Sequence, residues 1–389
     1  MKAVIAIDSM KGSLTSAEAG QAAAEGLRRV YPDAEVIVSP LADGGEGTAA
    51  ALVEGLHGRW QTCTVSGPLG TPVECRYGIL PDRTAVMEMS AAAGLTLAAP
   101  ADRNPMRTTT FGVGEMIGDA LDRGCRSFVI GIGGSATNDG GMGMLQALGF
   151  SFRDEDGRPA ARGGAGLLRL HSVSADGARP ELAECTFRVA CDVANPLCGP
   201  QGCSAVFGPQ KGADPAMIAQ LDDALARYAD RIRTVFPDAD AAAPGSGAAG
   251  GLGFAFRACL HAELTPGAEL VLRATRLADA LADAAVAITG EGRLDRQTMM
   301  GKAPSAVAKL AARYRVPVIA FAGCLADDAA VCNAHGIDAF FPILRKICTE
   351  EEAMQPQNAR RNLADTVEQV FRLWKVRNQY DKIYNGTEG

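Results

Sequence analysis

Four short segments of the sequence bring glycine, hydroxyl and acidic residues together. Such a mixture suits phosphate chemistry, because glycine lets backbone N–H groups approach an anion and a carboxylate can hold a metal ion or accept a proton. Each segment lies between a predicted strand and the next element of the chain. The segments are residues 8–13, 42–48, 131–141 and 289–295.

One such loop alone is ordinary structure, because a strand-to-helix turn often carries glycine and an acidic cap. Asn138 and Asp139, for example, could simply cap the helix predicted after them. All four segments are nevertheless expected at carboxyl ends of strands, where open α/β sheets bind ligands. Because carboxylates repel a bare phosphate, they indicate either bridging Mg²⁺ or a carboxylate that acts as a base. We therefore interpret the segments as parts of a ligand-binding site.

The nucleotide-binding motifs narrow the reaction class. The Walker pattern is absent, since Gly301-Lys302 has neither the upstream glycine nor the following hydroxyl residue, and the His-Arg-Asp and Asp-Phe-Gly triplets of protein kinases do not occur. Residues 131–136 satisfy the loose fingerprint Gly-x-Gly-x-x-Gly/Ala, which keeps an NAD-dependent dehydrogenase as an alternative. Against that alternative, the fingerprint falls in mid-chain, and Asn138-Asp139 places an acid where the pyrophosphate would lie.

The elements that must position these segments alternate between strand and helix at both ends of the chain. Thr15-x-x-Glu18 is a capping box that begins a helix ending before Pro32. In the middle, the turn at 81–83 predicts a hairpin, and apolar spacing over 215–235 predicts a long amphipathic helix. The strands expected at the two ends are 4–7, 35–38, 61–65, 286–289, 318–322 and 339–344, with helices over 46–56, from 303 and over 351–374.

This alternation predicts an α/β fold, with a Rossmann-like doubly wound parallel sheet domain and an inserted mixed α/β domain. The Rossmann-like domain is expected to be discontinuous, formed by residues 1–70 and 284–375. Residues 71–283 are expected to form the inserted domain. The polar residues 376–389 are expected to form a frayed tail.

Bulk composition excludes several classes of protein. The formal charge of −7 argues against nucleic acid as a partner. Eleven cysteines include no Cys-x-x-Cys pair, which favours reduced thiols over zinc ligands. The longest apolar runs are too short to span a bilayer, and the N-terminus lacks a signal-peptide pattern. We therefore expect a cytoplasmic protein with small-molecule substrates, no membrane partner and a monomeric or homodimeric state.

The sequence resembles the type-1 glycerate kinase family of bacteria from Met1 to about Trp374. Small departures occur at Met10 and Gly12, where the family pattern has Phe and Glu, and at Cys203, where it has a small residue. The matching strings are Asp8-Ser9-x-Lys11-x-Ser13, residues 42–48, residues 132–141, Cys191-Asp192-Val193-x-Asn195-Pro196-Leu197, residues 207–213, Thr289-Gly290-Glu291-Gly292-x-x-Asp295-x-Gln297-Thr298 and Gly301-Lys302-x-Pro304.

The resemblance implies an ATP-dependent phosphotransferase with an alcohol group as acceptor, which converts ATP and D-glycerate to ADP and a phosphoglycerate with Mg²⁺. Many members of the family resemble 2-kinases, so 2-phosphoglycerate is the expected product and 3-phosphoglycerate the alternative. A phosphometabolite sensor without catalysis is a third possibility. The full set of acids counts against a sensor, because binding alone would not need it.

Candidate roles follow from the chemistry of phosphoryl transfer, which needs positioning and charge neutralisation. Asp192 is the preferred general base, with Asp139 second, and Lys11 is a third candidate catalytic group. Turn formation before Pro196 is the alternative role for Asp192. Candidate metal ligands are Asp43, Glu46 and Asp295.

The remaining candidates are binding residues. Lys302 could face phosphate, although a solvated lysine is the commoner outcome at any single position. Expected nucleotide or phosphate contacts are Gly133, Gly134, Ser135, Thr137, Asn138, Gly290, Glu291, Gly292 and Lys302. Expected substrate contacts are Asp8, Ser9, Asp43, Asn195, Lys211 and Arg107.

Overall fold

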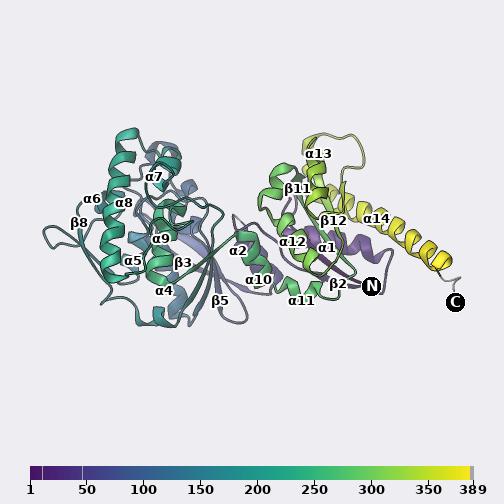
Figure 1. The fold of residues 1–389 in the computed structure, drawn as a ribbon, viewed down its shortest axis with the longest axis horizontal. Coiled ribbons are helices and arrows are strands. Elements are labelled where there is room, and N and C mark those ends of the chain that lie inside the picture. The colour runs from purple at the N-terminus through teal and green to yellow at the C-terminus, as the bar shows by residue number, and fades with distance from the viewer. Residues whose placement is uncertain (11, 46, 386–389) are drawn as a thin grey trace. The chain divides into compact units, whose positions relative to one another are not determined.

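The computed structural model describes residues 1–10, 12–45 and 47–385, with side chains described to residue 376. Contacts divide the chain into two compact units (Figure 1). The first unit contains residues 1–43, 54–56 and 271–389, and the second contains residues 44–53 and 57–270. Both units combine helices with a β-sheet, so the predicted α/β class is confirmed.

The first unit has a five-stranded sheet in the order β13-β12-β11-β1-β2, and every pair in it is parallel. This is the doubly wound arrangement that the alternation of strands and helices predicts. The elements are β1 (Lys2–Ile7), α1 (Ser16–Arg28), β2 (Glu35–Val38), α11 (Leu277–Leu281), β11 (Val286–Leu294), η5 (Arg296–Met300), α12 (Ala303–Arg313), β12 (Val318–Leu325), η6 (Ala329–His335), β13 (Ala339–Pro342), α13 (Glu350–Met354) and α14 (Pro356–Asn385).

Both faces of this sheet are buried by helices. Ile5 and Ile7 of β1 pack in one apolar cluster with residues of α1 and α14, such as Leu27 and Phe371. Neighbouring side chains of β1, including Val4, are also fully buried, as expected for a parallel strand covered on both sides. The start of α1 follows local sequence rules, because Thr15 and Glu18 form the predicted capping box.

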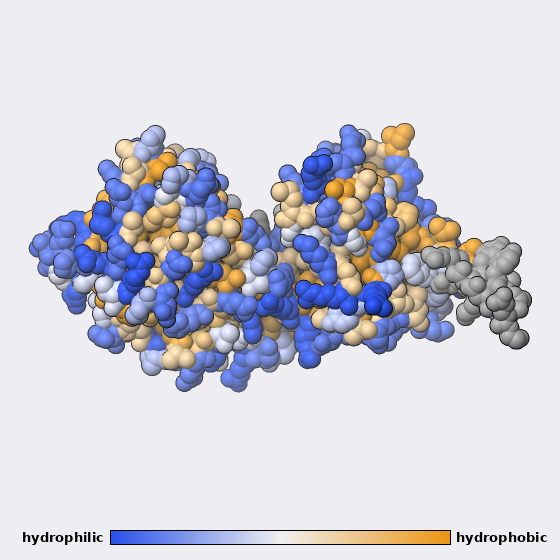
Figure 2. Space-filling model, viewed as in Figure 1, coloured by the Kyte–Doolittle hydropathy of each residue, from blue (hydrophilic) through white to orange (hydrophobic). Residues whose placement is uncertain are grey.

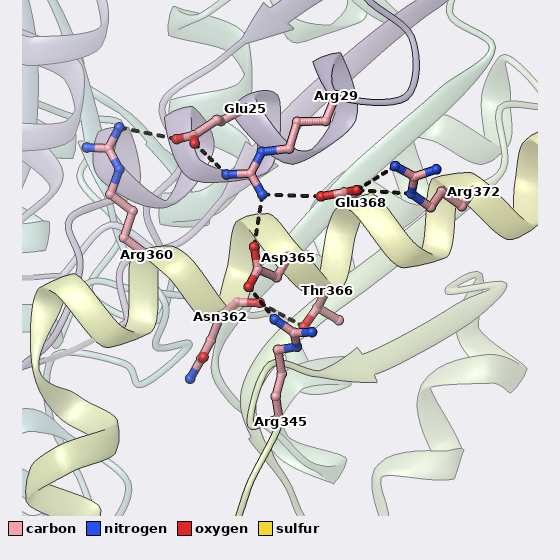
Figure 3. Close-up of polar contacts among 9 residues, drawn as sticks. All are labelled: Glu25, Arg29, Arg345, Arg360, Asn362, Asp365, Thr366, Glu368 and Arg372. Carbon is pink, nitrogen blue, oxygen red and sulfur yellow. Dashed lines mark hydrogen bonds and ion pairs between the residues drawn. The ribbon is translucent and has the colours of Figure 1, made fainter.

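A network of ion pairs joins α1 to α14 (Figure 3). Arg29 donates to Asp365 at 2.9 Å, to Glu368 at 3.2 Å and to Glu25 at 2.7 Å. Arg345 pairs with the same Asp365, so one carboxylate serves two guanidinium groups. These hydrogen bonds raise the pKa of Arg29 above its ordinary value, Asp365 having the largest effect. The network lies beside the apolar contact of the two helices and adds electrostatic stabilisation to it.

The C-terminal helix differs from its predicted span in two respects. Instead of one helix over 351–374, α13 and α14 are separated at Gln355, which has an extended ψ of 125°. The residue before proline disfavours helical geometry, and Pro356 follows. The helix α14 then continues to Asn385, eleven residues beyond the predicted end, since no glycine or proline occurs between Pro356 and Gly386.

The second unit has a six-stranded mixed sheet in the order β10-β9-β6-β5-β4-β3 and a separate two-stranded antiparallel sheet of β7 and β8. Strands β5, β6, β9 and β10 are parallel, while β4 pairs antiparallel with both β3 and β5. Its elements are β3 (Arg59–Ser66), β4 (Pro72–Ile79), β5 (Thr84–Glu88), α3 (Ser90–Ala93), η1 (Leu95–Leu97), η2 (Pro100–Asp102), α4 (Phe111–Asp122), β6 (Ser127–Gly131), α5 (Met142–Ala147), β7 (Ser151–Asp154), α6 (Gly164–Leu168), β8 (Leu170–Ser174), η3 (Pro180–Glu184), β9 (Thr186–Ala190), α7 (Cys203–Phe207), η4 (Pro209–Lys211), α8 (Pro215–Val235), α9 (Ala248–Leu260) and β10 (Glu263–Thr265).

The borders of the compact units differ from the predicted domain borders at residues 70 and 284. The strand β3 was expected in the parallel sheet of the first domain, but it pairs with β4 along its whole length, from Arg59↔Ile79 to Ser66↔Pro72. The helices α2 (Thr48–Gly55) and α10 (Gly267–Ala274) contribute residues to both units. The division into folding domains stays a prediction, since contacts alone define these units.

The predicted amphipathic helix is confirmed as α8, which begins after the cap Asp214 and buries Leu221, Leu225 and Tyr228. The core of the second unit also contains the stacked rings of Phe128 and Phe187, 4.7 Å apart. Hydrophilic and apolar residues are interspersed over the visible face of each unit (Figure 2). Within the described part of the chain, no helix combines the length and the apolar character needed to cross a bilayer.

Candidate functional site

The strand order of the first unit reverses direction between β1 and β11. From β1 the chain first adds β2 on one side, and it later adds β11, β12 and β13 on the other. Open α/β sheets bind ligands beyond the carboxyl ends of the strands at such a switch point. A cavity of about 680 Å³ lies at this edge. It is lined by the predicted residues Asp8, Ser9, Asp43, Glu291, Gly292, Asp295 and Lys302.

Glu291, near the end of β11, is the most enclosed acid of this cavity. Only 8% of the residue is exposed, and the hydroxyl of Thr298 donates to its Oε1 at 2.6 Å. Lys302 Nζ lies 3.4 Å from Glu291 Oε2 and 3.9 Å from Asp295 Oδ1. Burial raises the pKa of Glu291, and the hydrogen bond from Thr298 and the charge of Lys302 oppose that rise. One ammonium group therefore stands beside two carboxylates.

Local sequence explains how these side chains are held. Asp295 caps η5 by accepting from the N–H of Thr298 at 3.1 Å, and the hydroxyl of Thr298 accepts from the N–H of Asp295 at 3.1 Å. Gly301 ends this short helix with a φ of +112°, a conformation that favours glycine. Lys302 then occupies the cap position of α12. The cap at Asp295 and the turn at Gly301 thus place a carboxylate and an ammonium group from the same segment in one cavity.

The loop after β1 lies beside the end of β11. The N–H of Asp8 donates to the carbonyl of Gly290 at 2.9 Å, which extends the pairing of the two strands. The Oδ1 of Asp8 accepts from the N–H of Ser9 at 2.7 Å. Gly290 itself contributes backbone pairing rather than cavity lining. Asp8 therefore reaches the same cavity as Glu291 by direct strand pairing.

The carboxylate oxygens of this cavity match the ligand preference of Mg²⁺, which usually takes one or two carboxylates together with water and substrate phosphates. Among the residues that the structure describes, no three acidic, histidine or cysteine side chains are already grouped closely enough to hold a metal ion. The residues present therefore fit a metal that arrives with a phosphate ligand. Two predicted residues, Lys11 and Glu46, lie outside the described residues.

A second cavity, of about 320 Å³, lies in the second unit at the carboxyl ends of β6 and β9. Five predicted residues line it, namely Gly133, Gly134, Ser135, Asp192 and Lys211. Gly44 lines it too, with a φ of +90°. A Cβ atom at Gly44 would lie 2.4 Å from the Cα of Gly267, so this position of the sequence motif requires glycine.

Lys211 is the cation of this cavity and is almost completely buried, with 2% exposure. Its Nζ donates to Ser135 Oγ at 2.8 Å and to the carbonyl of Thr137 at 2.6 Å. Burial lowers the pKa of Lys211 to about 8. The lysine is therefore mostly charged at neutral pH, because its pKa still lies above 7.

Asp192 lies two residues after β9 and is exposed. Its Oδ1 accepts from the N–H of Gly267 at 3.0 Å, at the first residue of α10. Asp192 thus combines a capping contact with access to a cavity, which is compatible with its predicted role as a general base.

Asp139 has a different environment from Asp192. It is fully buried and accepts hydrogen bonds from Thr109, Thr110, Gly141 and Gly143 at 2.8–3.3 Å. Burial raises its pKa, although these hydrogen bonds counteract the effect. It lines neither cavity. This placement favours a structural role, in which Asp139 holds the loop before α5.

Other predicted residues also lie away from both cavities. Thr137 and Asn138 are fully buried, and Asn138 Nδ2 donates to Ser204 Oγ at 2.8 Å. Asn195 Nδ2 donates to the carbonyl of Gln201 at 2.8 Å, and Arg107 is exposed. None of the four lines the two cavities, so their predicted ligand contacts stay predictions.

Some of the residues that line each of the two cavities were not predicted from the sequence. Gly323 and Cys324 line the first cavity from β12, and the strand-end rule could have found them. Apolar side chains of the same cavity come from the loop after β13 and from α13, where no motif marked them. They include Ile343, Leu344, Cys348 and Met354. Phe207 and Gln210 line the second cavity. They lie in the string 207–213 that matches the family, but neither was predicted as a site residue.

Comparisons with known proteins agree with this geometry. A family model described as the glycerate kinase family matches residues 3–375. Glycerate 2-kinase of Escherichia coli K12 is 46% identical over 373 residues, which cover 94% of this chain and 98% of that protein. Glycerate kinase of Haemophilus influenzae is 46% identical over 374 residues, with 96% and 98% coverage.

A solved structure is similar over almost the whole chain. It is the crystal structure of a protein assigned as glycerate kinase 2 from Salmonella typhimurium LT2. The two chains are 48% identical, the TM-score is 0.90, and the match covers 97% of this chain and 99% of the other.

Proposed function

The chain belongs to the glycerate kinase family, and on this premise we propose that it transfers the γ-phosphoryl group of ATP to the 2-hydroxyl of D-glycerate. The 2-position is supported by the name of the Escherichia coli relative, which is a glycerate 2-kinase. Membership of this family removes the dehydrogenase alternative that the fingerprint at 131–136 had kept open.

The cavity at the β1/β11 switch point is the observation that carries the proposal. It combines acidic side chains with Lys302 and is large enough for a nucleotide-sized ligand, since small-molecule pockets range from about 300 to 1,000 Å³. Its apolar lining, from Ile343 to Met354, suits a base and its polar lining suits phosphates. We assign ATP to this cavity.

The acids of this cavity need a cation between them and the phosphates. When bound, Mg²⁺ would neutralise charge on the phosphate oxygens. Asp43 and Asp295 are the proposed ligands, and Lys302 adds a fixed positive charge beside Glu291. Phosphoryl transfer requires little covalent help from the protein, so these residues act by orientation and charge neutralisation.

Asp192 is the proposed general base. Its carboxylate would accept the proton of the acceptor hydroxyl as the oxygen attacks the γ-phosphorus and ADP departs. Exposure to the cavity of the second unit supports this choice over Asp139, whose oxygens are buried and occupied by protein donors.

The test is a reaction of the purified protein with ATP, Mg²⁺ and D-glycerate. ADP release and phosphorus-coupled carbon NMR of the product should identify 2-phosphoglycerate. Coupling of phosphorus to C2 and C3 but not to the carboxyl carbon would identify 3-phosphoglycerate and overturn the proposed position while keeping the kinase. Binding of ATP without ADP release would instead support the sensor alternative.

A further inference from the structure

Lys211 carries a buried positive charge that forms no ion pair within the described part of the chain. Its two acceptors are the neutral Ser135 hydroxyl and the carbonyl of Thr137. The contacts that Lys211 makes among the described residues include no ion pair, and the buried Asp139 acts on it only through its charge. Burying an ammonium group without an ion pair is costly, so a lysine in this position indicates a negatively charged ligand. An ammonium has three N–H donors, and two are used.

The surroundings of Lys211 suit a small anion. The cavity that it lines is the smaller of the two, at about 320 Å³. Gly133 and Gly134 line the same cavity, and a φ of +72° at Gly134 belongs to a turn whose backbone N–H groups can face an anion. Ser135 adds a hydroxyl that is already oriented by Lys211. The site therefore offers several donors around one positive charge.

The charge balance of this cavity selects the kind of anion. Lys211 is the one cation among its described lining residues, and Asp192 adds a carboxylate to the same lining. A polyphosphate carries more negative charge than one lysine neutralises. A single carboxylate matches the lysine, while Asp192 can accept a hydrogen bond from a hydroxyl group.

We propose that the cavity of the second unit binds a small hydroxy carboxylic acid, with its carboxylate at Lys211 and Ser135 and its hydroxyl group at Asp192. The identification of this acid as D-glycerate rests on the proposed function. Gly133, Gly134 and Ser135 then contact the organic acid instead of the nucleotide phosphates that the sequence predicts. Lys211 is a specificity-determining residue in this assignment, because it distinguishes an acid from its neutral analogue.

The experiment compares wild-type protein with Lys211→Met by calorimetric titration, using D-glycerate, its neutral amide D-glyceramide, and ATP with Mg²⁺. Lys211→Met should weaken D-glycerate binding roughly 100-fold, as expected when one member of a buried charge pair is removed. The preference of the wild type for D-glycerate over D-glyceramide should disappear with it. The affinity for ATP should stay unchanged. Lys309→Met, at an exposed position of α12, is the matched control and should behave as wild type.

A second variant protects the test against a folding defect of Lys211→Met. A Cβ atom at Gly133 would meet no other atom within 4 Å, so Gly133→Ala should fold normally. Its methyl group projects into the cavity and reduces the space for the ligand. This should raise the KM for D-glycerate about tenfold without changing the KM for ATP.

Outcomes separate this inference from the proposed function. If the variants lose affinity for ATP and retain that for D-glycerate, the cavity belongs to the nucleotide and the inference is overturned. Unchanged D-glycerate affinity and unchanged preference in Lys211→Met, or no D-glycerate binding by the wild type, also overturn it. Lys211-dependent binding of D-glycerate by a protein that transfers no phosphoryl group would support the inference and refute the proposed function.

Discussion

The hydroxyl of Thr298 donates to the carboxylate of Glu291 at 2.6 Å, and both groups are buried beside the first cavity. The same hydroxyl accepts from the N–H of Asp295, so one side chain links a helix cap to a strand-end acid. Thr298→Val keeps the shape and removes both contacts. It should lower the free energy of unfolding by about 1–3 kcal/mol, because a buried acceptor loses its donor.

Urea denaturation measures this difference. Thr298→Ser retains the hydroxyl and serves as the control, with stability closer to wild type. A loss in Thr298→Ser would measure the packing of the missing methyl group, whereas unchanged stability in Thr298→Val would show that the hydrogen bonds of the hydroxyl contribute little.

The pH dependence of D-glycerate binding should report Lys211. The pKa of this lysine is lowered to about 8 by burial, so its positive charge is present below pH 8 and lost above it. The KM for D-glycerate should therefore be level from pH 6.5 to 7.5 and then rise about tenfold for each pH unit above 8. The other titratable groups near Lys211 are Cys203 and Asp139, both buried, and Asp192 lines the same cavity.

The same lowered pKa has the opposite effect on the stability of the fold: a rise in pH weakens D-glycerate binding but stabilises the folded protein. Lys211 binds its proton less tightly in the folded protein than in the unfolded chain. Its contribution to the free energy of unfolding should therefore increase as pH rises from about 8 to 10.5.

Steady-state kinetics across pH, with D-glyceramide as a neutral comparison ligand, measure the predicted rise in the KM for D-glycerate. A KM for D-glycerate that stays level to pH 9.5 would exclude Lys211 as the carboxylate partner.

Asp192→Asn should reduce turnover about 100- to 10,000-fold, the contribution usual for a general base, with little change in the affinity for either substrate. Asparagine can still accept from the N–H of Gly267, so the start of α10 should be preserved. Single-turnover kinetics and calorimetry separate the two quantities. Near-normal turnover would assign proton removal to another group.

Arg29→Met should destabilise the first unit, because Arg29 joins α1 to two acids of α14 (Figure 3). Exposed ion pairs contribute about 0.2–1 kcal/mol each, so we expect a loss of about 1 kcal/mol at low ionic strength and less in 1 M salt. Arg372→Met, which removes a single pair with Glu368, is the control with a smaller loss. Chemical denaturation at two salt concentrations measures both; a salt-independent loss would point to packing of the Arg29 side chain.

Cys63 and Cys75 should form a disulfide under mild oxidation. They are directly opposed on β3 and β4, and their sulfur atoms lie 3.5 Å apart. The hydrogen bond from Cys75 lowers the pKa of Cys63, which favours the reactive thiolate. Hydrogen peroxide would oxidise one sulfur to a sulfenic acid, and the other thiol would displace water to close the bond.

Mass spectrometry of peptides under non-reducing conditions should detect this pair, with a mass lower by two hydrogen atoms. Cys63→Ser should remove it and leave the other thiols titratable. Oxidation that links other cysteines first would contradict the prediction.

Local features of the fold could be predicted well from the sequence, because they depend on neighbouring residues. The capping box of Thr15 and Glu18, the strand Glu35–Val38 and the helix Pro215–Val235 all occur where the sequence predicts them. The break at Gln355 is also encoded locally, in the proline that follows, although the prediction was one continuous helix over 351–374.

The residue types of the candidate site could likewise be chosen from sequence, since glycine, acid and lysine at strand ends carry the chemistry themselves. Which of those residues share a cavity depended on pairing between distant parts of the chain. Asp8 meets Glu291 only because β1 pairs with β11, and Lys211 reaches Ser135 across 76 residues. Burial separated Asp139 from Asp192 in the same way, because neighbours from other elements decide whether a carboxylate faces a ligand or the core. No local sequence pattern encodes which of these side chains lie close together or which are buried, so only the tertiary structure could decide it.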